Sequence, residues 1–393
     1  MYKIVTLNNI AKQGLSCFSE DNYVISNKDD NPDGIVLRSF NMHDMELPAS
    51  LKAVARAGAG VNNIPVEACS ERGVVVFNTP GANANAVKEL VLASLLLSSR
   101  KIVQGITWVK TLQGREDVAE AVEKNKAQFI GPEILGKKLG VIGLGAIGVL
   151  VANDAYRLGM EVYGFDPFIS VDAAWNLSRH ITKAASLDEI YRTCDYITIH
   201  VPFGSKTENM VNKDSFALMK EGTRLLNFSR AGLVNNDDLL KAIAAGTIGC
   251  YVTDFPVPAL LGNEAVIPVP HLGASTPESE ENCSVMASKQ LKDYLEYGTI
   301  VNSVNYPNCY LPHSGRRRFS VIHKNVPKVI GALTELLGDK GINISDMINK
   351  SRDKNALTLI DVDVDATREV DEALQSLRSE MLNMDSVINV RIL

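Results

Sequence analysis

Long hydrophobic runs, paired cysteines and blocks of like charge are all missing from this sequence of 393 residues. The longest apolar stretch, Leu90–Leu97, is far too short to cross a bilayer, and the first nine residues are typical of a strand and not of a signal peptide. A net charge of −6 without a basic block argues against nucleic acid and anionic membranes as partners. Tandem repeats and low-complexity segments are also lacking.

The cysteines are few and far apart. They stand at positions 17, 69, 194, 250, 283 and 309, and no two have the spacing of metal ligands or of a redox pair. We therefore expect free thiols in a cytoplasmic protein, and no metal site. The remaining composition is ordinary, with 46% hydrophobic and 22% charged residues. It predicts two or three domains with substantial hydrophobic cores.

A glycine-rich turn between a strand and a helix is the most informative stretch. The apolar run Leu139–Ile142 predicts a buried strand, and residues 146–158 predict a helix. Between them, Gly143 permits a tight turn, Gly145 permits close approach of a pyrophosphate, and Gly148 permits close packing of helix and strand. The helix N-terminus would offer free N–H groups to the phosphates. This pattern indicates a dinucleotide-binding site.

An acidic residue follows the next strand at the expected distance. Residues Glu161–Phe165 are strand-like and lead into Asp166, eighteen residues after Gly148. A carboxylate there accepts hydrogen bonds from ribose hydroxyls and repels a 2′-phosphate, which favours NAD over NADP. The alternative is an ordinary βαβ turn with an incidental aspartate.

Alternating strands and helices extend on both sides of this site. Before it, four short apolar runs and a helix beginning near Asn85 predict a first α/β unit. Its glycine-rich stretch 58–63 either presents backbone N–H groups to an anion or is a plain turn. Residues 117–128 are charged and predicted helical, either as an extended arm or as a dimer contact.

Polar residues follow the predicted strands beyond the glycine turn, where ligands bind in open α/β sheets. They are His200, Ser229, Arg230, Asp254 and His271. Reduction of a 2-keto acid requires a cation for the carboxylate, and a guanidinium binds it at two points. It also requires a proton donor that suits neutral pH, such as histidine. Arg230 and His271 fit these roles, and the alternatives are a surface ion pair and a buried, satisfied histidine.

The C-terminal part of the chain has a different predicted order of strands and helices. Strand-like runs and helical patterns alternate as βαββαβ after the triplet 316–318, with helices predicted over 327–338 and 368–381. Pro327 is predicted to lie in the first helical turn, and Gly341 in a loop just past the helix end.

Several motifs, in chain order, resemble one known family. They are Arg38-Ser39, residues 58–63, residues 78–83, residues 129–137, His200-Val201-Pro202, residues 227–230 and residues 270–273. Over nearly its whole length the chain is similar to the D-isomer specific 2-hydroxyacid dehydrogenases. Within this family it most resembles the members that act on 3-phosphoglycerate and carry a C-terminal ACT domain.

This resemblance implies a Rossmann-type doubly wound NAD-binding domain (99–275) inserted in a flavodoxin-like substrate domain (1–98 and 276–310). A βαββαβ ACT domain of ferredoxin-like fold (316–393) completes the predicted α/β architecture. The implied activity is NAD-dependent oxidation of 3-phospho-D-glycerate to 3-phosphohydroxypyruvate, the first step of L-serine biosynthesis. The resemblance also implies a homodimer or homotetramer, with serine as a candidate effector.

The residues of the implied site come from these motifs. Arg230 and His271 are the expected catalytic residues. The expected cofactor-binding residues are Gly143, Gly145, Ala146, Ile147, Gly148, Asp166, His200, Val201, Pro202, Thr207, Phe228, Ser229, Asp254 and Gly273. Those expected to bind substrate are Arg38, Ser39, Arg56, Ala59, Gly60 and Asn83. In the ACT domain, His323, Asn325 and Asn343 are expected to bind the effector.

One departure from the family bears on catalysis. Relatives carry a glutamate five residues after the aspartate that Asp254 matches, and Ala259 stands there in this chain. Glu264 is the only acid between Asp254 and His271. It lies seven residues before the histidine, across a strand with Pro268 and Pro270, so we expect His271 to act without a dedicated carboxylate. Two alternatives stay open. One is a different D-2-hydroxyacid substrate, such as glycerate, and the other is a non-catalytic protein that senses NAD, which only the missing glutamate supports.

Overall fold

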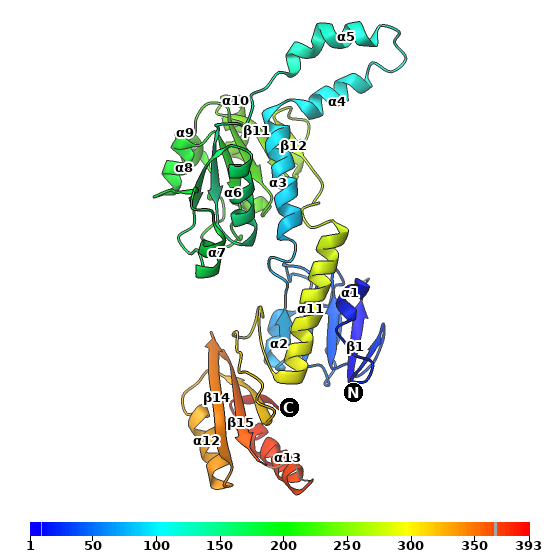
Figure 1. Ribbon diagram of the computed structural model, residues 1–393, viewed down its shortest axis with the longest axis vertical. Helices are drawn as coiled ribbons and strands as arrows, with labels where there is room; N and C mark the ends of the chain where they lie inside the picture. The colour runs from blue at the N-terminus through cyan, green and yellow to red at the C-terminus, as the bar shows by residue number, and fades with distance from the viewer. Residues whose placement is uncertain (9, 365–367) are drawn as a thin grey trace. The chain divides into compact units, whose positions relative to one another are not determined.

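The computed structural model describes residues 1–8, 10–364 and 368–393, which divide into two compact units (Figure 1). The first unit contains residues 1–82 and 280–393, and the second contains residues 83–279. The first unit is therefore discontinuous in sequence, as expected for a nucleotide-binding domain inserted into a substrate domain.

Five parallel strands form the main sheet of the first unit, in the order β2-β1-β3-β4-β5. They are β1 (Tyr2–Leu7), β2 (Tyr23–Ser26), β3 (Gly34–Leu37), β4 (Ala53–Arg56) and β5 (Val75–Phe77), with α1 (Lys12–Leu15), α2 (Val66–Glu71) and α11 (Pro277–Tyr297). Residues of α11 pack on one face of this sheet and α2 packs on the other. This strand order is that of flavodoxin-like folds, which confirms the predicted fold class of the substrate domain.

Seven parallel strands form the sheet of the second unit, in the order β12-β11-β10-β9-β6-β7-β8. The strands are β6 (Lys138–Ile142), β7 (Glu161–Phe165), β8 (Thr182–Lys183), β9 (Tyr196–Ile199), β10 (Thr223–Asn227), β11 (Ile248–Thr253) and β12 (Val266–Pro268). The order reverses between β6 and β9, which is the Rossmann arrangement. The predicted doubly wound fold is confirmed.

Helices cover both faces of this second sheet. Helices α3 (Ala84–Ser99) and α6 (Ala146–Arg157) pack on one face, while α8 (Leu187–Thr193), α9 (Lys213–Leu218) and α10 (Asn236–Ala244) pack on the other. The unit also contains α7 (Val171–Asn176) and the 3-10 turns η2 (Ala231–Leu233) and η3 (Pro258–Leu260). Because both faces are covered, the strands carry continuous apolar runs without alternation.

Helix α3 shifts the boundary between the units. The sequence predicts a boundary at 98/99, after this helix, whereas the structural division falls at 82/83, before it. Buried residues Val87, Val91 and Leu95 of α3 join the core that also contains Val149 and Ala152 of α6. Its apolar face therefore packs in the second unit, and periodicity alone identifies such a face but not its partner.

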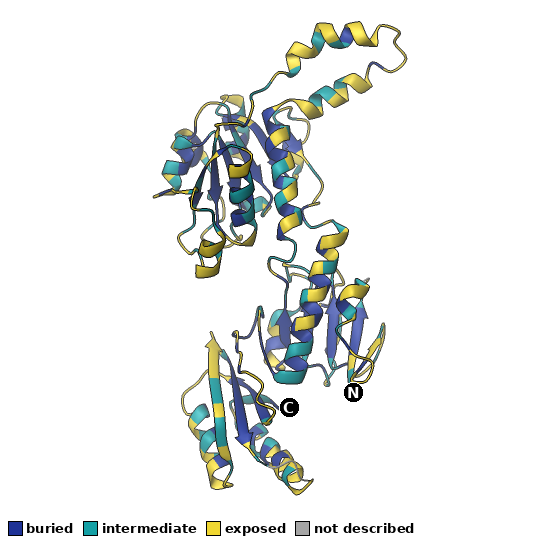
Figure 2. Ribbon diagram, in the orientation of Figure 1, coloured by how far each residue is buried: buried dark blue, intermediate teal, exposed yellow. Residues whose placement is uncertain are grey.

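A two-helix arm extends from the second unit, clear of its sheet (Figure 1). It consists of α4 (Ile102–Lys110), α5 (Val118–Asn125) and the 3-10 turn η1 (Lys126–Phe129). Helix α4 buries none of its residues, and Figure 2 shows exposed residues along both helices. Among the described residues no single helix is long and apolar enough to span a membrane, and the pair α3–α4, bent by 72°, meets that test on length and composition alone.

The C-terminal module is a four-stranded antiparallel sheet in the order β14-β15-β13-β16, with two helices. Its elements are β13 (Arg317–Lys324), α12 (Val329–Asp339), β14 (Asn343–Arg352), β15 (Asn355–Asp363), α13 (Arg368–Leu382) and β16 (Val387–Ile392). This arrangement confirms the βαββαβ, ferredoxin-like prediction and is consistent with an ACT domain. Pro327 is not in the first turn of α12, because Lys328 precedes the helix with a left-handed φ of 74°.

The C-terminal module shares a hydrophobic core with the rest of the first unit. Ile322, Leu357 and Leu359 of the module belong to the same buried cluster as Tyr294 and Leu295 of α11. The module is therefore packed onto its unit as well as tethered to it.

Candidate active site

The glycine turn between β6 and α6 has the geometry that a diphosphate requires. Gly143 has a φ of 91°, and a Cβ there would lie 2.5 Å from the carbonyl oxygen of His200, while a Cβ on Gly148 would overlap the carbonyl oxygen of Gly143. A Cβ on Gly145 would meet nothing within 4 Å. Gly145 is the N-cap of α6 and makes no side-chain capping hydrogen bond to the first turn, where the backbone N–H groups have no partner within the helix. The turn thus leaves room, and polarity, for an anion at this helix end.

Asp166 lies directly after β7 and holds the glycine turn. Its Oδ2 accepts a hydrogen bond from the N–H of Leu144 at 2.8 Å, and its Oδ1 accepts one from the N–H of Phe168 at 2.8 Å. An ionised carboxylate offers about four acceptor positions, so two backbone bonds leave capacity for ribose hydroxyls. The aspartate is therefore fixed in place next to the turn, where the sequence prediction requires it.

His200 follows β9 at the point where the strand order reverses. Its Nε2 lies 3.0 Å from Oγ1 of Thr198, and its buried Nδ1 has no hydrogen-bond partner among the described residues. Burial lowers the pKa of His200 to about 4, so the ring is neutral at neutral pH. The loop after it is held by Thr207, whose Oγ1 donates to the carbonyl of Pro202 at 2.7 Å.

Arg230 is positioned by the residues that precede it after β10. The side chain of buried Asn227 donates to the carbonyl oxygen of Arg230 at 2.9 Å, and Oγ of Ser229 donates to the carbonyl oxygen of Ile199 at 2.7 Å. Nη1 of Arg230 donates to the carbonyl oxygen of Ser229 at 2.6 Å, and the arginine side chain is exposed. Asn227 appeared in the sequence only as part of a motif, and its role as a backbone clamp emerges from these bonds.

Asp254 is the buried acid of this site. It lies after β11, is 2% exposed, and neither carboxylate oxygen has a hydrogen-bond partner among the described residues. Burial raises the pKa of Asp254, and electrostatic interactions with His271 and Arg230 oppose that shift. Gly273 lies beside this carboxylate, since a Cβ there would come to 3.4 Å from Oδ2 of Asp254, within ordinary van der Waals contact. The strand ends of β10, β11 and β12 therefore bring Arg230, Asp254 and His271 together.

Two further positions bear on a carboxylate partner for His271. Ala259 lies exposed in η3 and carries no carboxylate. Glu264 is exposed and precedes β12, whereas His271 follows that strand, so the two lie at opposite ends of it. The imidazole of His271 instead packs against the ring of Phe255, with centroids 4.7 Å apart. Asp254, in contrast, interacts electrostatically with the histidine.

Two cations lie at adjacent strand ends in the first unit. Arg38 follows β3 and Arg56 ends β4, and Nε of Arg56 donates to the carbonyl oxygen of Arg38 at 3.1 Å. Nη1 of Arg38 forms a half-exposed ion pair with Oε1 of Glu280 at 2.5 Å. The strand order reverses between β1 and β3, so these residues flank the ligand-binding edge of the flavodoxin-like sheet.

Asn8, after β1, is a further residue at this edge and was missed by the sequence predictions. It has a left-handed φ of 74°, and its side-chain oxygen accepts hydrogen bonds from the N–H groups of Ser39 at 3.1 Å and Phe40 at 2.6 Å. Asparagine tolerates this conformation better than most residues, which is the only signal that the sequence offered. Asn8 thereby fixes the backbone next to Arg38.

The glycine-rich stretch 58–63 is fastened to its neighbours. The side chain of Asn78 donates to the carbonyl oxygen of Ala59 at 2.6 Å, and the N–H of Thr79 donates to that of Gly58 at 3.1 Å. Asn63 donates to the carbonyl oxygens of Arg38 and Phe40. Asn83, also predicted to bind substrate, is the N-cap of α3 in the second unit and makes no side-chain capping bond.

The three predicted effector residues are not alike in the structure. His323 is 2% exposed, and its two ring nitrogens lie 2.8 Å from the carbonyl oxygen of Lys324 and 2.9 Å from Oγ1 of Thr358. Burial lowers the pKa of His323. Asn325 donates to the carbonyl oxygen of Asp353 at 3.0 Å, and Asn343 is exposed at the start of β14. His323 is thus a buried histidine with a hydrogen-bond partner at each ring nitrogen.

Sequence comparison gives the same assignment as this geometry. A sequence model described as "D-isomer specific 2-hydroxyacid dehydrogenase, NAD binding domain" matches residues 92–273. D-3-phosphoglycerate dehydrogenase of Haemophilus influenzae is 31% identical over 361 residues, which cover 89% of this chain and 83% of that protein. This chain belongs to the D-isomer specific 2-hydroxyacid dehydrogenase family.

Other members of this family are similar over less of their length. D-3-phosphoglycerate dehydrogenase of Methanocaldococcus jannaschii is 34% identical over 77% of this chain, but the match spans 56% of that longer protein. Among solved structures, D-mandelate dehydrogenase of Rhodotorula graminis has a TM-score of 0.66 at 21% identity, covering 80% of this chain and 99% of that one. NAD⁺-bound 3-phosphoglycerate dehydrogenase of Entamoeba histolytica has a TM-score of 0.59 at 23% identity, covering 79% and 99%. These structures support the fold.

As a member of the D-isomer specific 2-hydroxyacid dehydrogenase family, the chain is an oxidoreductase that uses NAD. The turn at Gly143–Gly148 and the carboxylate of Asp166 fit that cofactor, since the open position at Gly145 and the uncapped helix suit a pyrophosphate.

Proposed function

We propose that this enzyme oxidises 3-phospho-D-glycerate to 3-phosphohydroxypyruvate, the first step of L-serine biosynthesis. The observation that carries the proposal is the cluster of Arg230, His271 and buried Asp254 at the ends of three neighbouring strands. The name of the Haemophilus relative, and its coverage of most of the chain, support this substrate in preference to other 2-hydroxyacids.

The cations match the charges of this substrate. A guanidinium binds a carboxylate through two parallel hydrogen bonds, which suits Arg230, the exposed arginine of the cluster. In this proposal Arg38 and Arg56 bind the phosphate, with Ser39, Ala59, Gly60 and Asn83 contributing to the substrate site. Each charge-assisted bond to the phosphate is worth about 1.5–3 kcal/mol.

Cofactor binding is assigned to the strand ends of the second unit. NAD supplies the hydride acceptor when bound. In the proposal the residues that hold it are Gly143, Gly145, Ala146, Ile147, Gly148, Asp166, His200, Val201, Pro202, Thr207, Phe228, Ser229, Asp254 and Gly273. Because His200 is neutral at neutral pH, it adds no charge to the site.

His271 moves the proton in this mechanism. In the oxidation direction the neutral imidazole accepts the proton of the substrate hydroxyl as the carbonyl forms, and in reduction the imidazolium returns it. The charge of Asp254 stabilises the imidazolium electrostatically, without the dedicated glutamate that other family members carry. Asp254 is thus proposed to serve both the nicotinamide side and the histidine.

The test is an assay of the purified protein with NADH and, in parallel, 3-phosphohydroxypyruvate, hydroxypyruvate and pyruvate. We expect the highest kcat/KM with 3-phosphohydroxypyruvate, and a large loss of kcat in His271→Gln. Arg230→Gln removes the cation proposed to bind the substrate carboxylate. Arg179→Gln, which replaces another exposed arginine of the same unit, is its matched control. Preference for an unphosphorylated keto acid would mean that the substrate is another 2-hydroxyacid. NADH binding without turnover of any substrate would favour an NAD-sensing protein.

Assembly through the arm belongs to the same proposal. Ile102, Val103, Ile106 and Val109 of α4 are exposed apolar residues, and a second copy of the chain would cover them in a homodimer or homotetramer. Light scattering of the protein and of Ile106→Glu tests this, and an unchanged mass would exclude α4 as the contact.

Serine as an ACT-domain effector is tested by calorimetry on the full-length protein, because the module shares its core with the first unit.

A further inference from the structure

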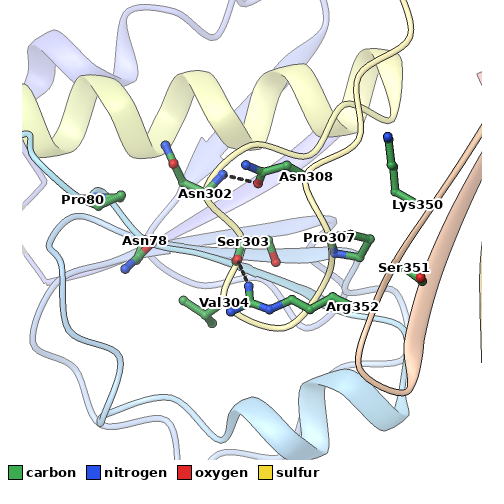
Figure 3. A pocket seen from close by; sticks show the side chains of 10 residues that line it. All are labelled: Asn78, Pro80, Asn302, Ser303, Val304, Pro307, Asn308, Lys350, Ser351 and Arg352. Atoms are coloured by element: carbon green, nitrogen blue, oxygen red, sulfur yellow. Dashed lines mark hydrogen bonds between the residues drawn. The ribbon is translucent and has the colours of Figure 1, made fainter. Parts of the chain in front are cut away.

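A cavity of about 600 Å³ lies within the first unit, and none of the residues assigned above to substrate or cofactor lines it (Figure 3). Its walls come from three segments: the end of β14, the loop 302–308 that follows α11, and residues 78–80 after β5. The cavity is large enough for a metabolite of moderate size. None of its described lining residues is acidic.

The lining has the chemistry of an anion site. Lys350 and Arg352 stand two positions apart on β14, so they project from the same face of the strand. Nη1 of Arg352 donates to the carbonyl oxygen of Ser303 at 2.8 Å, which uses one of five N–H donors and fixes the guanidinium at the wall. The amides of Asn78, Asn302 and Asn308 add uncharged donors and acceptors. Cations with surrounding amides suit a carboxylate or phosphate that carries hydroxyl or amino groups.

The loop on one side of the cavity is firmly held by both parts of the unit. Asn305 accepts a hydrogen bond from the N–H of Val76 at 2.9 Å and donates to the carbonyl oxygen of Val74 at 2.9 Å. Its own carbonyl oxygen accepts from the side chain of Asn355 at 2.9 Å, at the start of β15. The cavity wall therefore connects the C-terminal module directly to strand β5 of the substrate domain.

Asn78 links this cavity to the glycine-rich stretch. Its N–H donates to the carbonyl oxygen of Asn302 at 3.3 Å, and its carbonyl oxygen accepts from Gln290 of α11 at 3.0 Å. Its side chain, which lines the cavity, donates to the carbonyl oxygen of Ala59 at 2.6 Å. A ligand that forms hydrogen bonds with the side-chain amide of Asn78 therefore competes with the hydrogen bond from Asn78 to Ala59, which holds the stretch 58–63.

We propose that this cavity binds a small organic anion, a carboxylate or phosphate with hydroxyl or amino groups, and that occupancy acts on the substrate loop 58–63 through Asn78. The effect on catalysis rests on the function proposed above, whereas the binding itself does not. The site differs from the one predicted around His323, because it lies between β14 and the loop after α11.

Calorimetry on the full chain tests the binding. The background is the double variant Arg38→Ala/Arg230→Gln, which removes cations of the proposed active site, and the probes are inorganic phosphate, L-serine and 3-phosphoglycerate. We expect at least one probe to bind this background at millimolar concentration. Lys350→Gln should raise the Kd of that probe about tenfold or more, and tenfold corresponds to about 1.4 kcal/mol. Lys354→Gln, an exposed lysine of the same hairpin paired with Glu67, is the matched control and should bind as the background does.

Kinetics test the coupling separately. The probe that binds should change the KM of the otherwise unmodified enzyme for its hydroxyacid, and Lys350→Gln should remove that change while keeping turnover without the probe. Arg352→Lys should retain part of the effect because it keeps a cation. Equal binding by the Lys350 and Lys354 variants, or no binding of any probe to the background, would overturn the site. Binding with an unchanged KM would overturn the coupling, and absence of all turnover would contradict the proposed function without affecting the calorimetric result.

Discussion

Replacement of Arg318 by methionine tests how the C-terminal module is fixed to the substrate domain. Arg318 is the last of three consecutive arginines, and its side chain is 2% exposed. Its Nε and Nη2 donate to the two carboxylate oxygens of buried Asp361 at 2.5 and 2.9 Å. The guanidinium also donates to the carbonyl oxygens of Tyr297, Leu311 and Pro312, at 3.0, 3.0 and 2.8 Å.

The expected loss of stability follows from this burial. Removing one partner of a buried ion pair leaves an uncompensated charge and costs about 3–5 kcal/mol. In Arg318→Met, Asp361 would keep only the hydrogen bond from Ser314, and three carbonyl groups would lose a donor. Arg317 provides the matched control because its pair with Asp371 is exposed, at 38% and 52%, and such pairs contribute roughly 0–1 kcal/mol.

Native-state hydrogen exchange of the amides in β13 is the appropriate assay, because it reports the local free energy of opening in a chain with more than one folding unit. We expect Arg318→Met to lower that free energy by about 3–5 kcal/mol and Arg317→Met by less than about 1 kcal/mol. Equal and small losses in both variants would refute the argument from burial.

The pH dependence gives an independent check. Burial alone would raise the pKa of Asp361, but hydrogen bonds from Arg318 and Ser314 outweigh it and hold the pKa below its usual value. A carboxylate with a lowered pKa in the folded state contributes stability that is complete above about pH 4 and is lost as the pH falls through the lowered pKa. The difference between the wild type and Arg318→Met should therefore shrink below that pH.

The other predictions concern the proposed active site. Asp166→Ala should raise the ratio of kcat/KM for NADP to kcat/KM for NAD about tenfold or more. The substitution removes the acceptor for the ribose hydroxyls and the carboxylate that accepts a hydrogen bond from the N–H of Leu144. An unchanged ratio would contradict the assignment. Arg38→Ala should raise KM for the phosphorylated substrate by roughly 10- to 150-fold, equivalent to about 1.5–3 kcal/mol, with little effect on an unphosphorylated analogue; equal losses on both would show that Arg38 does not bind the phosphate. Asp254→Asn should be more stable than the wild type near pH 7 in urea unfolding. The reason is that the pKa of Asp254 is raised in the folded protein, so the ionised carboxylate opposes folding above about pH 4. The gain in stability should disappear at lower pH, and the same variant should lose activity. His200→Asn should flatten the acid side of the stability profile, because the lowered pKa of about 4 makes the wild type lose stability as the pH falls from about 6.5 toward 4. An identical slope in the variant would mean that His200 is not buried as described.

Local sequence patterns determined the elements and their chemistry. The glycine turn at 143–148 specifies its own conformation, because only glycine fits the φ of 91° at Gly143 and the contact at Gly148. The order βαββαβ of the C-terminal module was readable from periodicity. Arg230, Asp254 and His271 each follow a strand, so their location at a ligand-binding edge was also readable.

Tertiary structure decided which of these local features meet. Three consecutive arginines look alike in sequence, yet only Arg318 is buried, because the register of β13 and β15 brings it opposite Asp361. The same register buries His323 against Thr358 and leaves the anion cavity beside β14. Helix α3 packs in the second unit. Asp254 and His271 interact because the pairing of β11 with β12 places the ends of these strands side by side. Pairings of this kind depend on strand order and register over long sequence separations, and a periodic apolar face carries no information about the surface that will cover it.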